Sequence, residues 1–542
     1  MRILVVALLS CLAVPVVVAA EPCNSGVVFE DRNGDGHQDD AEAGIAGIKV
    51  SDGVEIVVTD TRGAYRLPVV DGRTTFVIKP AGYRLVLRDD GLPDHWRNVR
   101  LQAGPLLKYG GLPVAVPACK DFPLVAESGN ARHGSKLDVV VFADPQTKSP
   151  TDVDYYRRDI VQPLLDSAPA GNDAIADLGL SLGDIVNDDL SLYPSLNAHT
   201  AMMKVPWLHV AGNHDLDFDA ARDEDSLLTF RHHFGPDTFA WEEREAVFVV
   251  LDDVVYRPGQ TPAYIGGLRE DQFAFLERYL PTVPKERLLV IAVHIPFFDA
   301  APGRQTFRHS DRDRLFALLK GFPHVLLLSG HSHTQRHVFH GAANGWPGAG
   351  RLHEYNVGAA CGAFWSGVKD AQGIPDSSMS DGTPNGFARL RVSAGGEYAL
   401  SWHPARAPIG DATTTEAMSL HAPKVLRRGA WPAWAVYANV YMGRDDSRVE
   451  YRIDEGEWKP MSRVEQPDPR LLAENARDDQ ADALRGYDRS PEATPSRHLW
   501  RGVLATDLRV GEHRVEVRTF DAWQGEQRAQ THYRLDDARS EP

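Results

Sequence analysis

Two histidines stand two residues apart in the stretch LSGHSHTQ, directly after an apolar run. The run Val325–Leu328 stops at Ser329-Gly330, and His331 and His333 follow. Imidazole is the commonest metal ligand in proteins, so both rings can bind metal. The other interpretation is a polar loop without a ligand. This stretch alone does not distinguish the two, and the rest of the chain has to decide between them.

Four further apolar runs end in side chains that can bind metal. They are VVVFADPQ, LSLGDIVND, LHVAGNHD and LVIAVHIP. In α/β sheets, ligands bind in the crevice beyond the carboxyl ends of the strands. Mixed imidazole, carboxylate and amide ligands suit Mn, Fe, Zn or Co better than calcium. The candidate ligands at these four ends are Asp144 and Gln146, Asp184, Asn213 with His214 and Asp215 beside it, and His294.

The elements that must position these residues belong to an α/β region over 126–408. Strand candidates such as KLDVVVFAD, AVFVVLDD and RLLVIAVH alternate with helical stretches such as EDQFAFLERYL and RDRLFALLK. The helical stretches carry apolar residues at three-to-four spacing. Alternation of strands and helices predicts an α/β core.

The two flanks of this region read as all-β. Residues 21–125 contain short β-branched runs separated by Gly, Asp and Pro, which predicts an N-terminal β-sandwich. Residues 409–542 alternate polar and apolar side chains, which predicts a C-terminal β-sandwich-like domain. A polar segment within it, PDPRLLAENARDDQADALRGYDRSPEATPSRHLW, is interpreted as a long insertion or loop.

An acidic loop in the N-terminal region, DRNGDGHQDDAE, has the spacing of a calcium-binding loop. The stretches before and after it read as strands, so an EF-hand helix pair is not expected. The alternative is a solvated acidic turn. The spacing favours a structural calcium site whose ligands would be Asp31, Asn33, Asp35, Asp39 and Glu42.

The first 20 residues, MRILVVALLSCLAVPVVVAA, have the composition of a cleavable signal peptide. An uncleaved anchor and a lipoprotein site at Cys11 are the alternatives. Export predicts a periplasmic or secreted protein in which Cys23 and Cys119 pair, while Cys361 stays a buried free thiol. No later segment is apolar for long enough to span a bilayer, so the mature chain is expected to have no transmembrane segment.

The formal net charge of −17 disfavours nucleic acid as the partner. It does not exclude a phosphorylated substrate, because bound cations can reverse the local field. Composition leaves the oligomeric state open.

In order, D-x-Q, GD, GNH, H and GHxH resemble the signature of the calcineurin-like metallophosphoesterases, in which the commoner first motif is D-x-H. The flanking β-domains are similar to those of an exported bacterial subgroup. The resemblance implies a four-layer αββα sandwich that holds two metal ions. One ion would be bound by Asp144, Gln146, Asp184 and His333, and the other by Asp184, Asn213, His294 and His331. Gln146 is a neutral and weaker ligand than the histidine it replaces.

The resemblance also assigns roles around the metals. His214 would lie near the leaving group, and the nucleophile would be a metal-bridging hydroxide. Relatives place Asp at the position of Asn187 to orient this histidine, and here either Asp215 or Asp188 is expected to take that role. Phe364 and Trp365 either wall the substrate pocket or anchor a loop against the core.

The function implied is that of an exported, dinuclear-metal-dependent phosphoesterase acting on a small-molecule or lipid-type phosphoester. Diesters and monoesters both stay open. The lack of an Arg or Lys cluster beside the motifs favours diesters or bulky monoesters. The alternative is a surface-binding or adhesive protein with a catalytically silenced phosphoesterase-like core.

Overall fold

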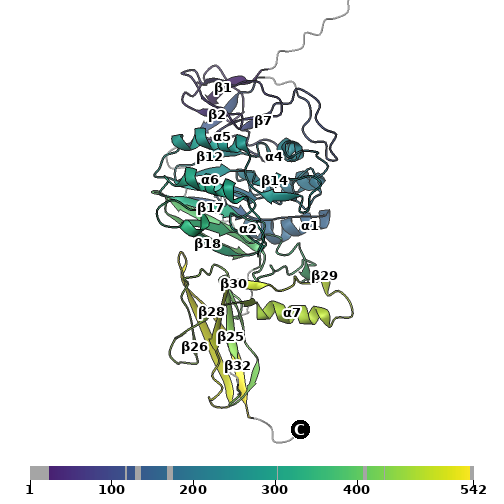
Figure 1. The fold of residues 1–542 in the computed structure, drawn as a ribbon, viewed down its shortest axis with the longest axis vertical. Coiled ribbons are helices and arrows are strands. Elements are labelled where there is room, and N and C mark those ends of the chain that lie inside the picture. The colour runs from purple at the N-terminus through teal and green to yellow at the C-terminus, as the bar shows by residue number, and fades with distance from the viewer. Residues whose placement is uncertain are drawn as a thin grey trace, which may run out of the picture.

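The computed structural model describes residues 23–115, 119–127, 136–167, 175–301, 303–406, 412–431 and 434–537. The expected signal peptide lies outside these residues. Three regions follow one another along the long axis of the molecule: an N-terminal sandwich, a central α/β region and a C-terminal sandwich (Figure 1). Within the described part of the chain, no helix is both long and apolar enough to cross a membrane.

The central region contains two mixed sheets packed face to face. The first has the order β11-β10-β9-β21-β22 and the second β12-β13-β16-β17-β19-β18. Neighbouring strands are parallel from β9 to β11 and from β13 to β19, whereas β21 runs antiparallel to β9. β10 and β16 are buried along their whole length, as strands covered on both faces require. The strands are β9 (Lys136–Phe142), β10 (Leu178–Leu182), β11 (Trp207–Val210), β12 (Phe239–Glu242), β13 (Ala246–Val250), β16 (Leu288–Ala292), β17 (Val325–Ser329), β18 (Arg336–His340), β19 (Leu352–Asn356), β21 (Gly386–Ser393) and β22 (Tyr398–Pro404).

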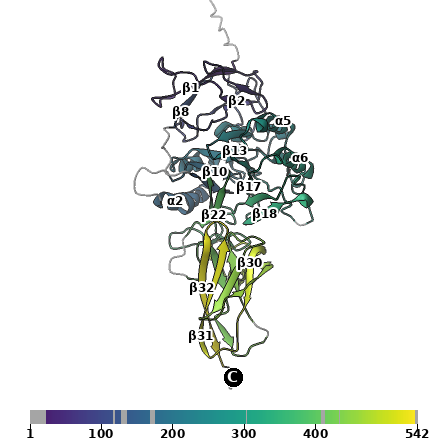
Figure 2. The ribbon, with the colours of Figure 1, turned by 90° about the vertical axis from the view of Figure 1, so that its left-hand side faces the viewer.

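Helices cover both outer faces of the sheet pair. Figure 2 shows α2 on one side of the strands, with α5 and α6 on the other. Each helix turns its apolar stripe inward, as in α5, where Phe273 and Leu276 are buried. The four-layer αββα sandwich expected from the sequence is therefore confirmed. The helices are α1 (Pro150–Tyr155), α2 (Gln162–Asp166), α3 (Tyr193–Ala201), α4 (Leu228–Phe234), α5 (Glu270–Tyr279) and α6 (His309–Leu319).

The N-terminal region is a sandwich of two four-stranded sheets, β4-β1-β8-β6 and β3-β2-β5-β7. Its buried apolar core is continuous with that of the central region, since the ring of Phe76 lies 6.2 Å from that of Phe275. Cys23 and Cys119 form the expected disulfide, and Cys361 is free and buried. The strands are β1 (Ser25–Glu30), β2 (Lys49–Ser51), β3 (Ile56–Val58), β4 (Ala64–Arg66), β5 (Thr74–Val77), β6 (Tyr83–Leu85), β7 (Trp96–Asn98) and β8 (Phe122–Ala126).

The C-terminal region is a second sandwich, with sheets β23-β25-β30-β28 and β24-β32-β31-β26-β27 around a separate apolar core. It touches the central region at one end, where Trp523 packs against His337 and stacks on His353. The strands are β23 (Met418–His421), β24 (Val425–Arg427), β25 (Ala435–Val440), β26 (Val449–Ile453), β27 (Lys459–Pro460), β28 (Ser462–Pro467), β30 (Pro495–Val503), β31 (Gly511–Asp521) and β32 (Gly525–Asp536).

The polar segment between β28 and β30 is not simply a loop, so that interpretation was incomplete. It contains helix α7 (Pro469–Asp479) and the short strand β29 (Gly486–Asp488). The carboxylate of Asp468 accepts hydrogen bonds from the backbone N–H groups of Arg470 and Leu471, and Pro469 occupies the first turn. Both are standard helix-start signals.

Candidate metal centre

The candidate ligands meet at the edge where the carboxyl ends of both central sheets lie together. Asp144, Asp184 and Asn213 follow β9, β10 and β11 of the first sheet, while His294 and His331 follow β16 and β17 of the second. Close approach of these loops requires glycine. A Cβ on Gly183 would lie 2.6 Å from Nδ1 of His294, and one on Gly212 would lie 2.2 Å from Oδ1 of Asp184.

The backbone is left-handed at five of the candidate ligands, all of them non-glycine residues. Their φ angles are 48° at Asp144, 38° at Gln146, 48° at Asp184, 69° at His331 and 48° at His333. This conformation costs free energy for residues with a Cβ and collects at functional sites. Sharp turns at the strand ends are what direct these side chains to a common point.

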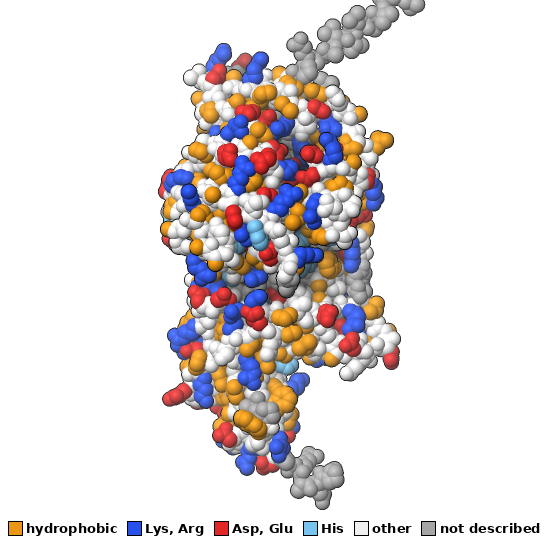
Figure 3. Space-filling view, viewed as in Figure 1, with side chains coloured by type: hydrophobic (Ala, Val, Ile, Leu, Met, Phe, Trp, Pro, Cys, Tyr) orange, Lys and Arg blue, Asp and Glu red, His pale blue; other side chains and the backbone are white. Residues whose placement is uncertain are grey.

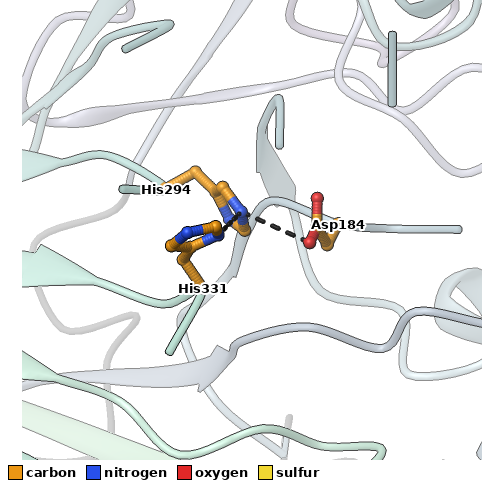
Figure 4. A group of neighbouring side chains, drawn as sticks. All are labelled: Asp184, His294 and His331. Carbon is orange, nitrogen blue, oxygen red and sulfur yellow. Dashed lines mark hydrogen bonds and ion pairs between the residues drawn. The ribbon is translucent and has the colours of Figure 1, made fainter. Parts of the chain in front are cut away.

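Asp184, His294 and His331 form the one group of three or more His, Cys, Asp or Glu side chains within metal-binding distance among the described residues. Figure 4 shows the two imidazoles and the carboxylate converging. Nε2 of His294 lies 3.3 Å from Oδ2 of Asp184, 3.2 Å from Nδ1 of His331 and 3.1 Å from Oδ1 of Asn213.

A second group lies beside the first. Nε2 of His333 is 3.5 Å from Oδ1 of Asp144, and Nε2 of Gln146 is 3.4 Å from Oδ2 of Asp184. The amide oxygen Oε1 of Gln146 is buried and has no hydrogen-bond partner. A buried acceptor without a partner is costly unless something else satisfies it, and a cation is the natural candidate here.

Backbone carbonyls orient two of the histidine rings. Nδ1 of His294 donates to the carbonyl of Leu182 at 2.8 Å, and Nδ1 of His333 donates to that of Gly362 at 2.7 Å. Each Nε2 therefore faces the site, which is the orientation that metal-binding histidines adopt.

The charges of the site favour a cation. Burial lowers the pKa of His294, but the charge of Asp184 outweighs it and the pKa rises to about 10. Burial and the neighbouring His294 lower the pKa of His331 to about 4, so this ring stays in the neutral form that binds metal. The residues present fit a site for divalent cations.

His214 is held by Asp188. Its Nδ1 lies 2.7 Å from Oδ1 of Asp188, and its backbone N–H donates to Oδ1 of Asp184 at 2.8 Å. Burial lowers the pKa of His214, but the charges of Asp184 and Asp188 raise it above its usual value overall. Of the two carboxylates considered from the sequence, Asp188 is thus the one that orients His214.

The expectation that Asp215 acts with His214 is corrected. The Asp215 carboxylate is fully buried and accepts hydrogen bonds from the backbone N–H groups of Gly212 and Ile185 and from the hydroxyl of Tyr193. Burial raises its pKa to about 7. Asp215 ties the loop after β10 to the loop after β11, so it supports the ligands without facing the cleft.

Asp253 is a supporting residue that the sequence reasoning missed. Oδ1 of this buried carboxylate accepts from the backbone N–H groups of His294 and Ile295, both at 3.1 Å. Burial raises its pKa well above its usual value. The signal was present, because the run AVFVVLDD also ends in acidic residues at a strand end.

The ligand side chains open into a cleft of about 340 Å³. Phe364 lines it, with its ring 4.9 Å from that of His333 and 45% of its surface exposed. Trp365 does not line it. This side chain is fully buried, and its Nε1 donates to the carbonyl of Pro145, so the pocket role is corrected to the loop-anchoring one. The cleft lining also includes Tyr264, Ser380, Pro491 and Glu492, which the sequence reasoning did not identify.

The acidic loop of the N-terminal sandwich uses its carboxylates internally. Asp31 accepts from the N–H groups of Gly34 and Gly36, and the Asn33 amide donates to both Asp35 and Asp39. Glu42 accepts from the N–H groups of Arg32 and Asp39. Calcium binding at this loop stays a prediction.

Three family models match the chain. "N terminal of Calcineurin-like phosphoesterase" matches residues 32–106, "Calcineurin-like phosphoesterase" residues 137–335, and "C terminal of Calcineurin-like phosphoesterase" residues 354–527. Together they span most of the chain, in the order of the three structural regions. No curated protein matches.

Solved structures of phosphatases are remotely similar. A dimetal phosphatase from Danio rerio is 14% identical over 50% of this chain and 96% of its own, with a TM-score of 0.34. A purple acid phosphatase from yellow lupin (Lupinus luteus) seeds is 13% identical over 71% of this chain and 67% of its own, with a TM-score of 0.37.

Proposed function

The chain belongs to the calcineurin-like phosphoesterase family and is a metal-dependent phosphoester hydrolase, and we propose that it is an exported enzyme that uses two transition-metal ions and prefers phosphodiesters. The observation that carries the two-ion proposal is the paired donor set. One set surrounds Nε2 of His294, and the other surrounds Nε2 of His333 beside the unpartnered Oε1 of Gln146.

The donor sets divide as the family resemblance implies. Asp184 lies between the two groups and would contact both ions, since its Oδ2 is close to His294 on one side and to Gln146 on the other. When bound, the cations supply Lewis-acid stabilisation and make water a nucleophile near neutral pH. Asp144, Gln146, Asp184 and His333 would hold one ion, and Asp184, Asn213, His294 and His331 the other.

His214 is the group that would assist the leaving oxygen. Asp188 occupies its Nδ1, which leaves Nε2 for the cleft that His214 lines. The adjacent carboxylates favour the protonated ring, which can donate a proton to a departing alkoxide. Asp188 is a positioning residue in this scheme because it acts through His214.

Charge favours a diester over a monoester. Among the described residues, the cleft lining includes no Lys or Arg, the usual partners of a dianionic terminal phosphate. A diester carries one negative charge less and needs no such clamp. On the face that Figure 3 shows, acidic and basic side chains are interspersed, which supports a small-molecule or lipid-type phosphoester rather than nucleic acid.

Export to the periplasm or the medium is supported by the signal-like first 20 residues and by the disulfide between Cys23 and Cys119. Structural disulfides persist in oxidising compartments and are rare in the cytosol.

The test is hydrolysis of bis-p-nitrophenyl phosphate and p-nitrophenyl phosphate by protein stripped with chelator and then given Mn²⁺. We expect metal-restored turnover, faster on the diester. His214→Ala should lower kcat by about a hundredfold or more without loss of folding. His532→Ala, an exposed histidine of the C-terminal sandwich, is the matched control.

The proposal is contradicted if Mn²⁺, Zn²⁺, Fe²⁺ and Co²⁺ all leave both esters intact. The core is then catalytically silenced, and the alternative of a surface-binding protein replaces the phosphoesterase proposal.

A further inference from the structure

Part of the cleft wall comes from the distant segment between β28 and β30. Pro491 and Glu492 line the same cleft as Asp184 and His214. They follow His333, the last candidate ligand in the chain, only after the remainder of the central region and much of the C-terminal sandwich. The C-terminal region therefore contributes directly to the candidate active site.

Strand pairing explains how this wall reaches the site. β29 pairs antiparallel with β20 (Gly367–Val368), and Gly367 lies opposite Asp488. In an antiparallel pair, the chain that enters one strand and the chain that leaves the other lie at the same end. Phe364, just before β20, and Glu492, just after β29, therefore follow from the same end of this strand pair, and both line the cleft.

The segment 490–494 is fixed on two sides by hydrogen bonds. Toward α7, the Asn475 amide donates to the carbonyl of Pro491 at 2.8 Å and its oxygen accepts from the N–H of Ala493 at 3.0 Å. Toward the central region, the N–H of Thr494 donates to the carbonyl of Ser380 at 2.8 Å. Glu492 therefore lies on a segment that hydrogen bonds hold in place from two sides.

Helix α7 is itself anchored to the central region. Asp468, which caps the helix, lies with its Oδ2 2.6 Å from Nδ2 of Asn439, and that amide also donates to the carbonyl of Asp381 at 2.8 Å. Asp381 in turn contacts Nε2 of His498 at 3.1 Å. These buried contacts fix the helix, and with it the wall, relative to the metal ligands.

The chemistry of this wall is acidic and aromatic. Among the described residues, Glu492 is the one carboxylate of the cleft lining besides Asp184. Phe364 lines the same cleft and is substantially exposed. A carboxylate and an aromatic face attract a cation and disfavour a second negative charge. Arg304 does not line the cleft. Its charge only opposes the rise that burial causes in the pKa of Tyr264, a lining residue.

We propose that Glu492 and Phe364 form a specificity wall that selects phosphodiesters whose non-leaving alcohol carries an alkylammonium group. This inference rests on the proposed phosphoesterase function and names its substrate class. The cationic group would lie against the wall while the phosphodiester lies over the metal ligands. A free diester and a lipid headgroup share this chemistry.

Two chromogenic diesters with the same leaving group test the proposal: p-nitrophenyl phosphorylcholine, which is cationic at its second alcohol, and p-nitrophenyl phenyl phosphate, which is not. The measured quantity is the ratio of their kcat/KM values. We expect Glu492→Gln to lower the ratio about threefold to fivefold, the scale of an exposed charge pair, and Glu492→Lys to lower it further. Added salt should reduce the difference, because exposed charges are screened.

Glu512→Gln is the matched control. Glu512 is exposed at the start of β31, at the opposite end of the strand from the turn that carries Trp523 to the central region. Its ratio should equal that of the wild type. An unchanged ratio in both Glu492 variants, with turnover intact, would overturn the specificity wall and leave the phosphoesterase function standing. Absence of metal-restored turnover on every ester would instead remove the function on which the wall rests.

Glycerophosphocholine in solution and phosphatidylcholine in vesicles, offered to the wild-type protein and to Glu492→Lys, distinguish the two sources. If the wild-type protein hydrolyses glycerophosphocholine faster than phosphatidylcholine, the result supports a free diester. If it hydrolyses phosphatidylcholine faster, the result supports a lipid headgroup. If the wild type and Glu492→Lys hydrolyse each compound at the same rate, the result counts against the proposal.

Discussion

The metal centre and the acidic loop of the N-terminal sandwich are built from similar side chains, and both have the spacing of a cation site. They differ in how their polar atoms are used. In the acidic loop, the carboxylates of Asp31 and Glu42 accept from backbone N–H groups of the loop itself. At the metal centre, Oε1 of Gln146 is buried without a partner, and Nε2 of His294 faces three other donor atoms.

Backbone conformation separates the two sites as well. Left-handed non-glycine residues collect at the strand ends of the metal centre, whereas in the acidic loop the left-handed positions are taken by Gly34 and Gly36. Glycine adopts this conformation without strain. The difference teaches that one site holds its shape at a cost that a bound ion can offset, while the other is a turn that can hold its shape without one.

The largest expected difference between the two sites is in turnover. Asp184→Asn should lower kcat by about a thousandfold, because the carboxylate that lies between both donor groups loses its charge. Asp35→Asn, the same chemical change in the acidic loop, should leave kcat within about twofold. Steady-state hydrolysis of bis-p-nitrophenyl phosphate measures both. Comparable losses in the two variants would contradict the comparison.

The next difference between the two sites is expected in metal affinity. It should be smaller than the difference in turnover, but it reports directly on one metal ligand. Gln146→Ala should weaken metal binding at least about tenfold, and Gln146→His should tighten it, because imidazole is a stronger ligand than an amide. Calorimetric titration with Mn²⁺ measures this. Gln38→Ala is the control, since the Gln38 amide donates to a backbone carbonyl within the acidic loop. An unaltered affinity in Gln146→Ala would remove Gln146 from the ligand set.

His209 is a buried polar side chain outside the cleft lining, so it should affect stability but not turnover. Both ring nitrogens of His209 are buried without a hydrogen bond, and burial lowers its pKa from 6.5 to about 3. Between these values the unfolded chain takes up a proton that the folded chain does not. Stability therefore falls as the pH drops below about 6.5, by up to about 1.4 kcal/mol per pH unit for this group.

His209→Leu removes this contribution. Its free energy of unfolding should decline less than that of the wild type between pH 6.5 and pH 4, with metal-restored turnover at neutral pH preserved. Denaturant unfolding at several pH values measures the difference. Parallel curves for the two proteins would show that His209 is hydrated or paired in solution.

The smallest effect is expected from calcium at the acidic loop. If the sequence-based prediction is correct, calcium should raise the melting temperature by about 2 °C through preferential binding to the folded state, with no change in turnover. A variant with Asp35→Asn and Asp39→Asn should lose this shift. A melting temperature that calcium leaves unchanged in the wild type would make the loop an acidic turn.

Much of the fold and of the candidate site follows from local sequence. The apolar runs from Leu178–Leu182 to Val325–Ser329 are short and flanked by glycine, so their strand character is evident. Helix α7 was missed because its polar composition outweighed the start signal of Asp468 and Pro469, which local rules could have recognised.

The sequence by itself determined the chemistry at each strand end: which runs are buried, and which carboxylate, amide and imidazole groups follow them. Only the tertiary structure decided that Asp188 rather than Asp215 faces His214, that Trp365 is buried while Phe364 lines the cleft, and that Glu492 joins it. The physical reason is that residue spacing determines the face of an element. The direction of a side chain on a tight turn, and contacts between distant segments, depend instead on how the loops and sheets pack together.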